Sequence, residues 1–181
     1  KVQDYPKMYE RGLKHHNAGR HREAVAELMP IIEARPKAAD PYKLCGLSLA
    51  QLNDYGEALR IVDIGRTVIS DDYELDLMKV ENLVRLGMHD EAVALVEKKK
   101  KKYPDNMDVL SFRVLTLQRT NRQKEGLDSA KALVEKEPDN FRHLNSLGMA
   151  YMCIPDFLEA AKIFIQAAKI NPQYYPTLMN L

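Results

Sequence analysis

A period of 34 residues runs through this chain of 181 residues. Small residues recur at that interval, at Ala24, Ala58, Ala92, Gly126 and Ala160. Prolines follow the same interval at Pro36, Pro104, Pro138 and Pro172, and Ser70 stands at the one position of the series that lacks a proline. A fixed period of this length indicates a repeat array, in which each repeat packs mainly on its neighbours. We therefore predict one array over residues 1–181 rather than separate globular domains.

Each period has the pattern of two amphipathic helices. In the last period, apolar and small residues recur three and four positions apart in two runs: Leu144, Leu147, Gly148 and Tyr151, then Ala160, Phe164, Ala167 and Ala168. That spacing places each run on one face of a helix. The predicted fold class is therefore all-α, with five helix–turn–helix repeats and the start of a sixth. The predicted repeats are residues 5–38, 39–72, 73–106, 107–140 and 141–174, followed by a partial helix at 175–181.

This pattern resembles the tetratricopeptide repeat, whose signature is an apolar residue, Leu-Gly, Tyr, Ala, Phe, Ala and Pro at fixed offsets. The fifth period matches it with the two runs above and Pro172. The second period matches it with Tyr42, Cys45, Gly46, Leu49, Ala58, Val62 and Gly65. The resemblance covers about residues 5–174 and implies a right-handed α-solenoid that acts as a protein–protein interaction scaffold, not as an enzyme.

The resemblance also implies a concave groove, lined by the first helix of each repeat, that binds segments of partner proteins. Its groove offsets fall on Tyr9, Leu13, His16, Lys43, Leu47, Gln51, Leu77, Glu81, Arg85, Ser111, Leu115, Arg119, Asn145, Met149 and Met152. The apolar members form a central line flanked by polar and basic groups, which suits an amphipathic helix or an extended peptide. The same leucines could instead pack between repeats, and the sequence leaves both alternatives open.

One known use of the repeat is disfavoured. Chaperone-binding members hold a C-terminal carboxylate with a lysine and an asparagine in the first groove helix. Here those two offsets carry Tyr9 and Leu13, which cannot make charge-assisted hydrogen bonds to a carboxylate.

The sequence shows no motif of a catalytic or cofactor-binding site. It contains no phosphate-binding Gly-Lys-Ser/Thr loop, no His-Glu-x-x-His and no Gly-x-Ser-x-Gly. The adjacent His15 and His16 point about 100° apart on a helix and cannot share a metal ion from one face. We predict no catalytic residue, no cofactor and no metal. Cys45 and Cys153 lie in distant repeats, so we expect no disulfide between them and a reducing compartment.

The sharpest local feature is an uninterrupted run of lysines: Lys98, Lys99, Lys100, Lys101 and Lys102. One interpretation is a solvated helix end, because cations interact well with the last carbonyls of a helix. The other is a basic patch for an anionic membrane surface. The net charge of +1 gives no overall attraction to nucleic acid. Nucleic acid is disfavoured also because Glu91, Glu97 and Asp105 flank the run without a series of stacking aromatic residues.

The second helix of the last repeat is unusually apolar, with Ile163, Phe164, Ile165, Ala167, Ala168 and Ile170. Repeat arrays need a polar face at each end for solubility. Only residues 174–181 follow this helix here. We therefore expect either further chain beyond it or self-association through the ends of the array.

A narrower resemblance concerns the opening repeat. The segment Arg11–Arg20, followed by Ala24, Val25 and Leu28, resembles the first repeat of tetratricopeptide scaffolds found on bacterial magnetosomes. This implies a cytoplasmic bacterial protein, peripheral on the magnetosome membrane, that self-assembles and recruits partners. Lys1 in place of a methionine, and an end inside a helical pattern, favour the alternative of an adaptor arm from a larger signalling or secretion-related protein. The identity of the partner is beyond the sequence.

Overall fold

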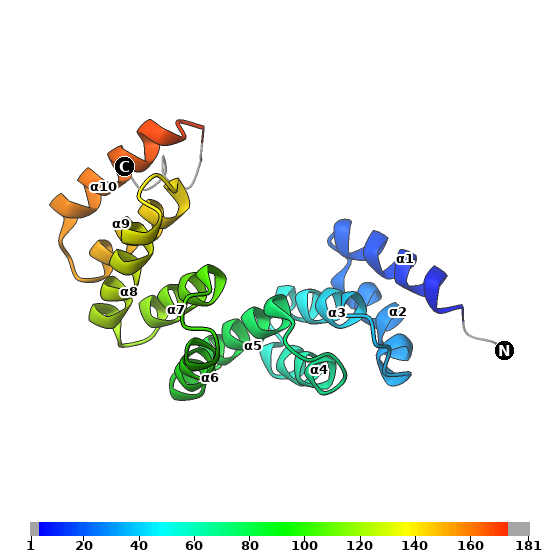
Figure 1. The fold of residues 1–181 in the computed structure, drawn as a ribbon. Coiled ribbons are helices and arrows are strands. Elements are labelled where there is room, and N and C mark those ends of the chain that lie inside the picture. Colours follow the sequence, from blue (N-terminus) through cyan, green and yellow to red (C-terminus); the bar gives the residue numbers. More distant parts are fainter. Residues whose placement is uncertain (1–3, 174–181) are drawn as a thin grey trace. The chain divides into compact units, whose positions relative to one another are not determined.

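The computed structural model describes residues 4–173, and every regular element in that range is an α-helix. Figure 1 shows these helices in chain order, and α1 packs on α2, α3 on α4, α7 on α8 and α9 on α10. They are α1 (Tyr5–Asn17), α2 (His21–Glu33), α3 (Asp40–Gln51), α4 (Tyr55–Val68), α5 (Tyr73–Arg85), α6 (His89–Lys102), α7 (Met107–Arg119), α8 (Gln123–Lys136), α9 (Phe141–Cys153) and α10 (Phe157–Ile170). The predicted all-α helical repeat is confirmed. The predicted partial helix at 175–181 lies outside the described residues.

Short polar side chains start many of these helices, and they follow the 34-residue period. At the first helices, a carboxylate or amide oxygen accepts a backbone N–H of the first turn at Asp4, Asp72, Asn106 and Asn140. At the second helices the same bond is made by Asp54 and Asp156. Each such cap satisfies an N–H group that has no partner within the helix and contributes about 1 kcal/mol. The period therefore specifies the ends of helices as well as their buried faces.

Two glycines let paired helices approach closely. A Cβ added at Gly12 of α1 would lie 3.0 Å from the Cγ atom of Leu28 in α2. A Cβ added at Gly148 of α9 would lie 2.7 Å from the Cδ1 atom of Phe164 in α10. Leu28 and Phe164 are both fully buried, so the large side chain occupies the space that the glycine leaves.

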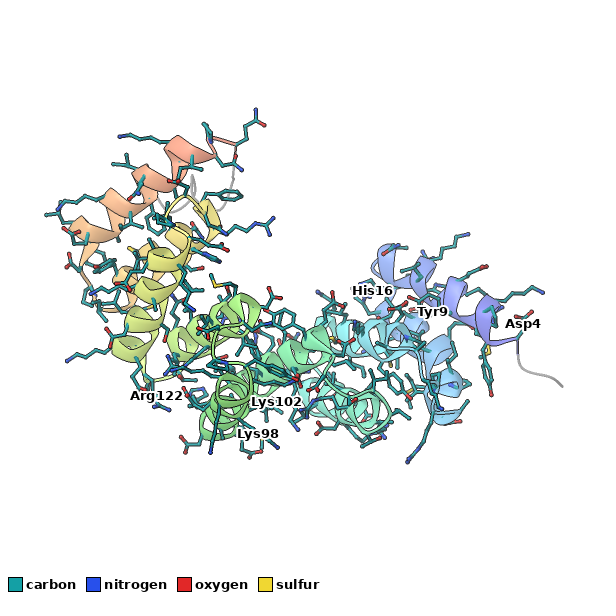
Figure 2. All side chains as sticks on the ribbon, viewed as in Figure 1. Asp4, Tyr9, His16, Lys98, Lys102 and Arg122 are labelled. Carbon is teal, nitrogen blue, oxygen red and sulfur yellow. The ribbon has the colours of Figure 1, made fainter. Side chains whose placement is uncertain are left out.

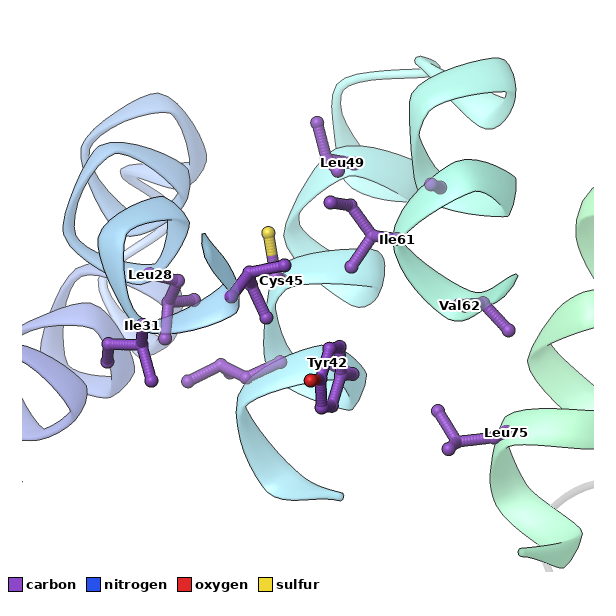
Figure 3. Packing of buried hydrophobic residues seen from close by; sticks show 11 residues of the cluster. Leu28, Ile31, Tyr42, Cys45, Leu49, Ile61, Val62 and Leu75 are labelled. Carbon is purple, nitrogen blue, oxygen red and sulfur yellow. The ribbon is translucent and has the colours of Figure 1, made fainter. Parts of the chain in front are cut away.

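The described helices form two compact units, α1–α5 and α6–α10, divided after Met88. The core of the first unit draws on four successive helices: Leu28 and Ile31 of α2, Tyr42, Cys45 and Leu49 of α3, Ile61 and Val62 of α4, and Leu75 of α5 (Figure 3). The core of the second unit contains Leu110, Val114, Leu127, Ala130, Leu133, Leu147 and Ala150. The division falls between the two helices of the predicted repeat 73–106. The single array over residues 1–181 stays a prediction.

Cys45 belongs to the core of the first unit, where burial raises the pKa of its thiol to about 12 and keeps it protonated. Cys153 is exposed, and neither cysteine forms a disulfide. Across residues 4–173, each helix is too short or too polar to cross a bilayer.

Candidate functional site

The first helices of the first unit present two exposed leucines. The helices α1, α3 and α5 lie side by side, since α3 contacts both α1 and α5. The predicted site residues Leu13 on α1 and Leu47 on α3 are 38% and 45% exposed, and both lie outside the buried cluster. Tyr9 and Leu77 are half-buried and Gln51 is exposed. We call this surface the α1–α3–α5 face. The exposure favours contact with a ligand over packing between repeats for both leucines.

His16 links α1 to α3 on this face (Figure 2). Its Nδ1 atom lies 2.8 Å from the Oγ atom of Ser48. The Ser48 hydroxyl already donates to the carbonyl oxygen of Leu44, so Nδ1 of His16 is the donor in this contact. Burial, and then the nearby His21 ring at 5.1 Å, lower the pKa of His16. His16 therefore offers the face a neutral imidazole rather than a positive charge near pH 7.

Lys43 is already engaged by carboxylates. Its Nζ atom lies 2.9 Å from Asp72 and 2.6 Å from Glu74, at the start of α5. Burial lowers the pKa of Lys43, but the hydrogen bonds that its ammonium group donates to Glu74 and Asp72 outweigh burial, and the pKa is raised overall. Asp72 also caps α5 through the backbone N–H of Leu75. Lys43 thus joins α3 to α5, and a ligand would meet an ion pair at this position.

Arg85 and Glu81 form a second ion pair, along α5. The Nε atom of Arg85 lies 3.1 Å from the Oε1 atom of Glu81, and its guanidinium lies 5.8 Å from the centre of the Tyr55 ring. The charges on the α1–α3–α5 face are thus largely balanced by these ion pairs. The groups that remain open to a ligand on this face are the exposed leucines Leu13 and Leu47.

The first helices of the second unit, α7 and α9, also contact each other. Leu115 on α7 is 38% exposed, and Met149 and Met152 on α9 are 38% and 43% exposed. We call this surface the α7–α9 face. The remaining predicted positions on it are Ser111 and Asn145, which are half-buried, and Arg119, which is exposed.

The lysine run does not act as one patch of five. Lys98, Lys101 and Lys102 are exposed, whereas Lys99 and Lys100 are half-buried. Residues three and four positions apart share one face of a helix, so the exposed lysines project together from α6. We call them the α6 lysine face, and Figure 2 labels its two ends, Lys98 and Lys102.

Lys100 instead borders a surface pocket of about 430 Å³ between α6, α7 and α8. The charged residues that line this pocket are three cations and three carboxylates: Lys100, Arg113, Lys136, Asp105, Glu125 and Asp128. Because these charges balance, the pocket has no net attraction for an anion.

Sequence reasoning missed Arg113, which lines this pocket. Its side chain is only 12% exposed, and its Nε atom lies 2.7 Å from Glu97 Oε1 of α6. Its guanidinium also donates to the hydroxyl of Ser129 in α8. Arg113 therefore ties three consecutive helices together. A usable signal was the period itself, since Asp63 and Lys79, each 34 residues earlier, form the corresponding ion pair at 2.6 Å.

Gln118 was also missed. Its Nε2 atom donates to the backbone carbonyl of Ser146 at 2.8 Å and so joins α7 to α9. Nowhere in residues 4–173 do three His, Cys, Asp or Glu side chains gather in a group that could hold a metal ion.

A family model described as "Psidin, N-terminal TPR repeats region" matches residues 82–181. The chain belongs to the tetratricopeptide repeat family. Proteins of this fold are commonly protein-interaction scaffolds and typically have no enzymatic activity. A search of curated proteins found no match.

Solved tetratricopeptide repeat structures resemble the chain over almost its whole length. A thermophilic protein from Thermus thermophilus, TTC0263, is 14% identical, with a TM-score of 0.72 over 97% of this chain and 95% of that one. MamA from Desulfovibrio magneticus RS-1, solved from residue 41 to its end, is 18% identical, with a TM-score of 0.68 over 96% and 99%.

A third similar structure is YrrB, described as a tetratricopeptide repeat protein with an unusual peptide-binding site. It is 16% identical, with a TM-score of 0.60 over 99% of this chain and 98% of that one. At these identities the likeness concerns the fold. The resemblance to magnetosome scaffolds is confirmed at that level, because the chain has a MamA-like fold.

Proposed function

We propose that this tetratricopeptide repeat protein is a non-enzymatic scaffold that binds segments of partner proteins on its first helices. The observation that supports the proposal is an exposed apolar side chain at one register of four first helices. Leu13, Leu47, Leu115 and Met149 follow the 34-residue period and are 38–45% exposed. Within each unit, the exposed apolar side chains of neighbouring first helices offer anchoring points for a partner segment.

The partner segment that fits these faces has apolar anchors rather than a high net charge. Lys43 and Arg85 are already paired with carboxylates, and His16 is neutral. Tyr9 and Leu13 offer no cation for a terminal carboxylate. An amphipathic helix or an extended peptide with apolar residues is therefore the expected class of partner.

Selection from a phage-displayed peptide library tests this proposal. A selected peptide should bind purified protein with a measurable Kd, and Leu13→Glu with Leu47→Glu should weaken binding on the α1–α3–α5 face at least ~10-fold. Leu52→Glu is the matched control, because Leu52 is 37% exposed but lies at the end of α3, outside the predicted groove positions. Failure to select any peptide, or equal Kd values for the double variant and the control, would contradict the proposal.

We further propose self-assembly and a cytoplasmic location peripheral to the magnetosome membrane. The MamA-like fold supports the location, and the α6 lysine face is the surface suited to contact anionic lipid. A fluorescent fusion expressed in a magnetosome-forming bacterium should line up with the magnetosome chain. Diffuse fluorescence, with correct folding of the fusion, would contradict this location.

A further inference from the structure

The last helix of residues 4–173, α10, exposes an apolar stripe. Leu158, Ala161, Ile165 and Ala168 are spaced by three, four and three residues, which is the a/d spacing of a coiled-coil seam. Leu158 is 69% exposed and Ile165 is 48% exposed, and the two alanines are half-buried. We call these four residues the α10 stripe. It is distinct from the face that packs on α9, which carries Ala160, Phe164 and Ala167.

At one register of this stripe, that of Ile165, three earlier second helices contact the next first helix in the chain. At the register of Ile165, Asp63 of α4 pairs with Lys79 of α5 at 2.6 Å. At the same register, Glu97 of α6 pairs with Arg113 of α7 at 2.7 Å. In α8, Lys131 lies 5.8 Å from the centre of the Tyr151 ring of α9. Ile165 therefore stands at a register that docks a helix in three earlier repeats.

The composition of the stripe differs from that of its counterparts. At the register of Leu158, the earlier second helices carry exposed polar or small residues: Arg22, Gly56, Asp90 and Lys124. At the register of Ile165, α4, α6 and α8 carry charged residues. Among the described second helices, α10 alone has large apolar residues at both registers, Leu158 and Ile165. The helix that covers this stripe must therefore present an apolar surface instead of ion-pairing groups.

We propose that the stripe is covered by the α10 helix of a second copy of this chain, packed antiparallel. A two-fold axis beside residue 163 then sets Leu158 against Ala168 of the second copy, and Ile165 against Ala161. Each layer combines one large and one small side chain, which lets the helices approach closely and fill the space between them. The same axis brings Lys169 near the start of the second α10 helix, where Asp156 and the helix dipole favour a cation.

Head-to-tail stacking of copies is disfavoured by the first helix. Cys45 and Leu49 of α3 belong to the buried core that α3 shares with the preceding helix, α2. At the same register, α1 carries Arg11 and His15, and the Arg11 side chain is 51% exposed and paired with Glu27. An apolar stripe packed on these groups would remove water from the charged side chains without offering them new hydrogen bonds. Pairing of α10 with α10 avoids that cost and closes a dimer rather than extending a filament.

This inference rests on the self-association in the proposed function. Light scattering after size exclusion should show the mass of the purified chain rising with concentration from that of one copy towards that of two. The variant L158K/I165K gives α10 the lysines that α8 carries at Lys124 and Lys131, and it should raise the dimer dissociation constant at least ~100-fold. Leu52→Lys, a change at an equally apolar exposed site in the first unit, should leave the dissociation constant unchanged.

Each other outcome overturns the inference in a recognisable way. If the chain associates but L158K/I165K has no effect, the stripe is not the interface, and the proposed self-association stands. If the chain stays monomeric and L158K/I165K lowers its melting temperature, the stripe is covered within a single copy instead. If it stays monomeric with an unchanged melting temperature, both the interface and the self-association are wrong, while binding of the selected peptide still tests the scaffold.

The orientation has its own test. In a Cys153→Ser background, the pair A161C/I165C should form interchain disulfides on mild oxidation, because the antiparallel axis brings residue 161 of one copy beside residue 165 of the other. A161C alone should cross-link more slowly. Equal cross-linking of the single and the double variant would overturn the antiparallel arrangement.

Discussion

Gly148 allows the closest approach between α9 and α10. The ring of Phe164 fills the space beside it, and Phe164 is fully buried and cannot move into solvent. At the equivalent position of the fourth repeat the sequence has Val114, and the facing residue is the small Ala130, which is also buried. One repeat thus pairs a very small residue with a large one, and the other pairs two residues of moderate size. Cores tolerate such exchanges well when the total volume is roughly kept.

Gly148→Ala should destabilise the protein. The added Cβ would lie 2.7 Å from Phe164 Cδ1, so the ring or the helix must shift, at a cost of about 1–3 kcal/mol. The higher helix propensity of alanine offsets at most ~1 kcal/mol of this. Urea unfolding should therefore show a net loss of about 1 kcal/mol in the free energy of unfolding.

Gly56→Ala is the control, because a Cβ added at Gly56 of α4 meets nothing within 4 Å beyond its chain neighbours and the backbone of its own helix. It should leave stability unchanged or raise it by up to ~1 kcal/mol. A stability of Gly148→Ala equal to that of Gly56→Ala would show that Phe164 does not limit this contact.

At the scale of the element, the 34-residue period predicted the helices well because capping residues, glycines and buried apolar residues all follow it. It predicted the surface less well, because exposure depends on what the neighbouring helices cover. The lysine run shows this. The five lysines are identical in the sequence, whereas in the helix Lys98, Lys101 and Lys102 are exposed and the other two are half-buried. Arg113 was missed because its partners Glu97 and Ser129 are each 16 residues away, on other helices.

The recurring ion pair between a second helix and the next first helix gives a prediction at this scale. The basic residue of the pair Glu97–Arg113 is more buried than that of the pair Asp63–Lys79. The side chain of Arg113 is 12% exposed, and that of Lys79 is 21% exposed. Double-mutant cycles with glutamine or asparagine at these positions should give a coupling of about 1 kcal/mol for Glu97–Arg113. The coupling should be about 0.5 kcal/mol or less for Asp63–Lys79, because exposed pairs are screened.

Thermal or urea unfolding of the single and double variants measures both couplings. A larger coupling for Asp63–Lys79 would mean that burial of the guanidinium does not strengthen the pair.

At the scale of the whole molecule, nearly equal numbers of basic and acidic residues leave a net charge of +1. Attraction to an anionic surface must therefore arise from a local group of charges. The α6 lysine face is such a group, and each lysine near an anionic bilayer contributes about 1 kcal/mol. Three lysines amount to about 3 kcal/mol, or a ~100-fold change in binding.

The triple variant K98Q/K101Q/K102Q should accordingly lose ~100-fold in affinity for vesicles that contain phosphatidylserine, measured by co-sedimentation. The matched control K7Q/K14Q/K37Q changes three exposed lysines of the first unit and shifts the net charge equally, from +1 to −2. If the α6 lysine face binds the membrane, the control variant should keep most of its affinity for the vesicles. Raised salt should weaken vesicle binding of the unchanged protein, because salt screens the charges. Equal losses in both variants would assign the attraction to net charge, and unchanged binding of K98Q/K101Q/K102Q would remove the α6 lysine face from any role at the membrane.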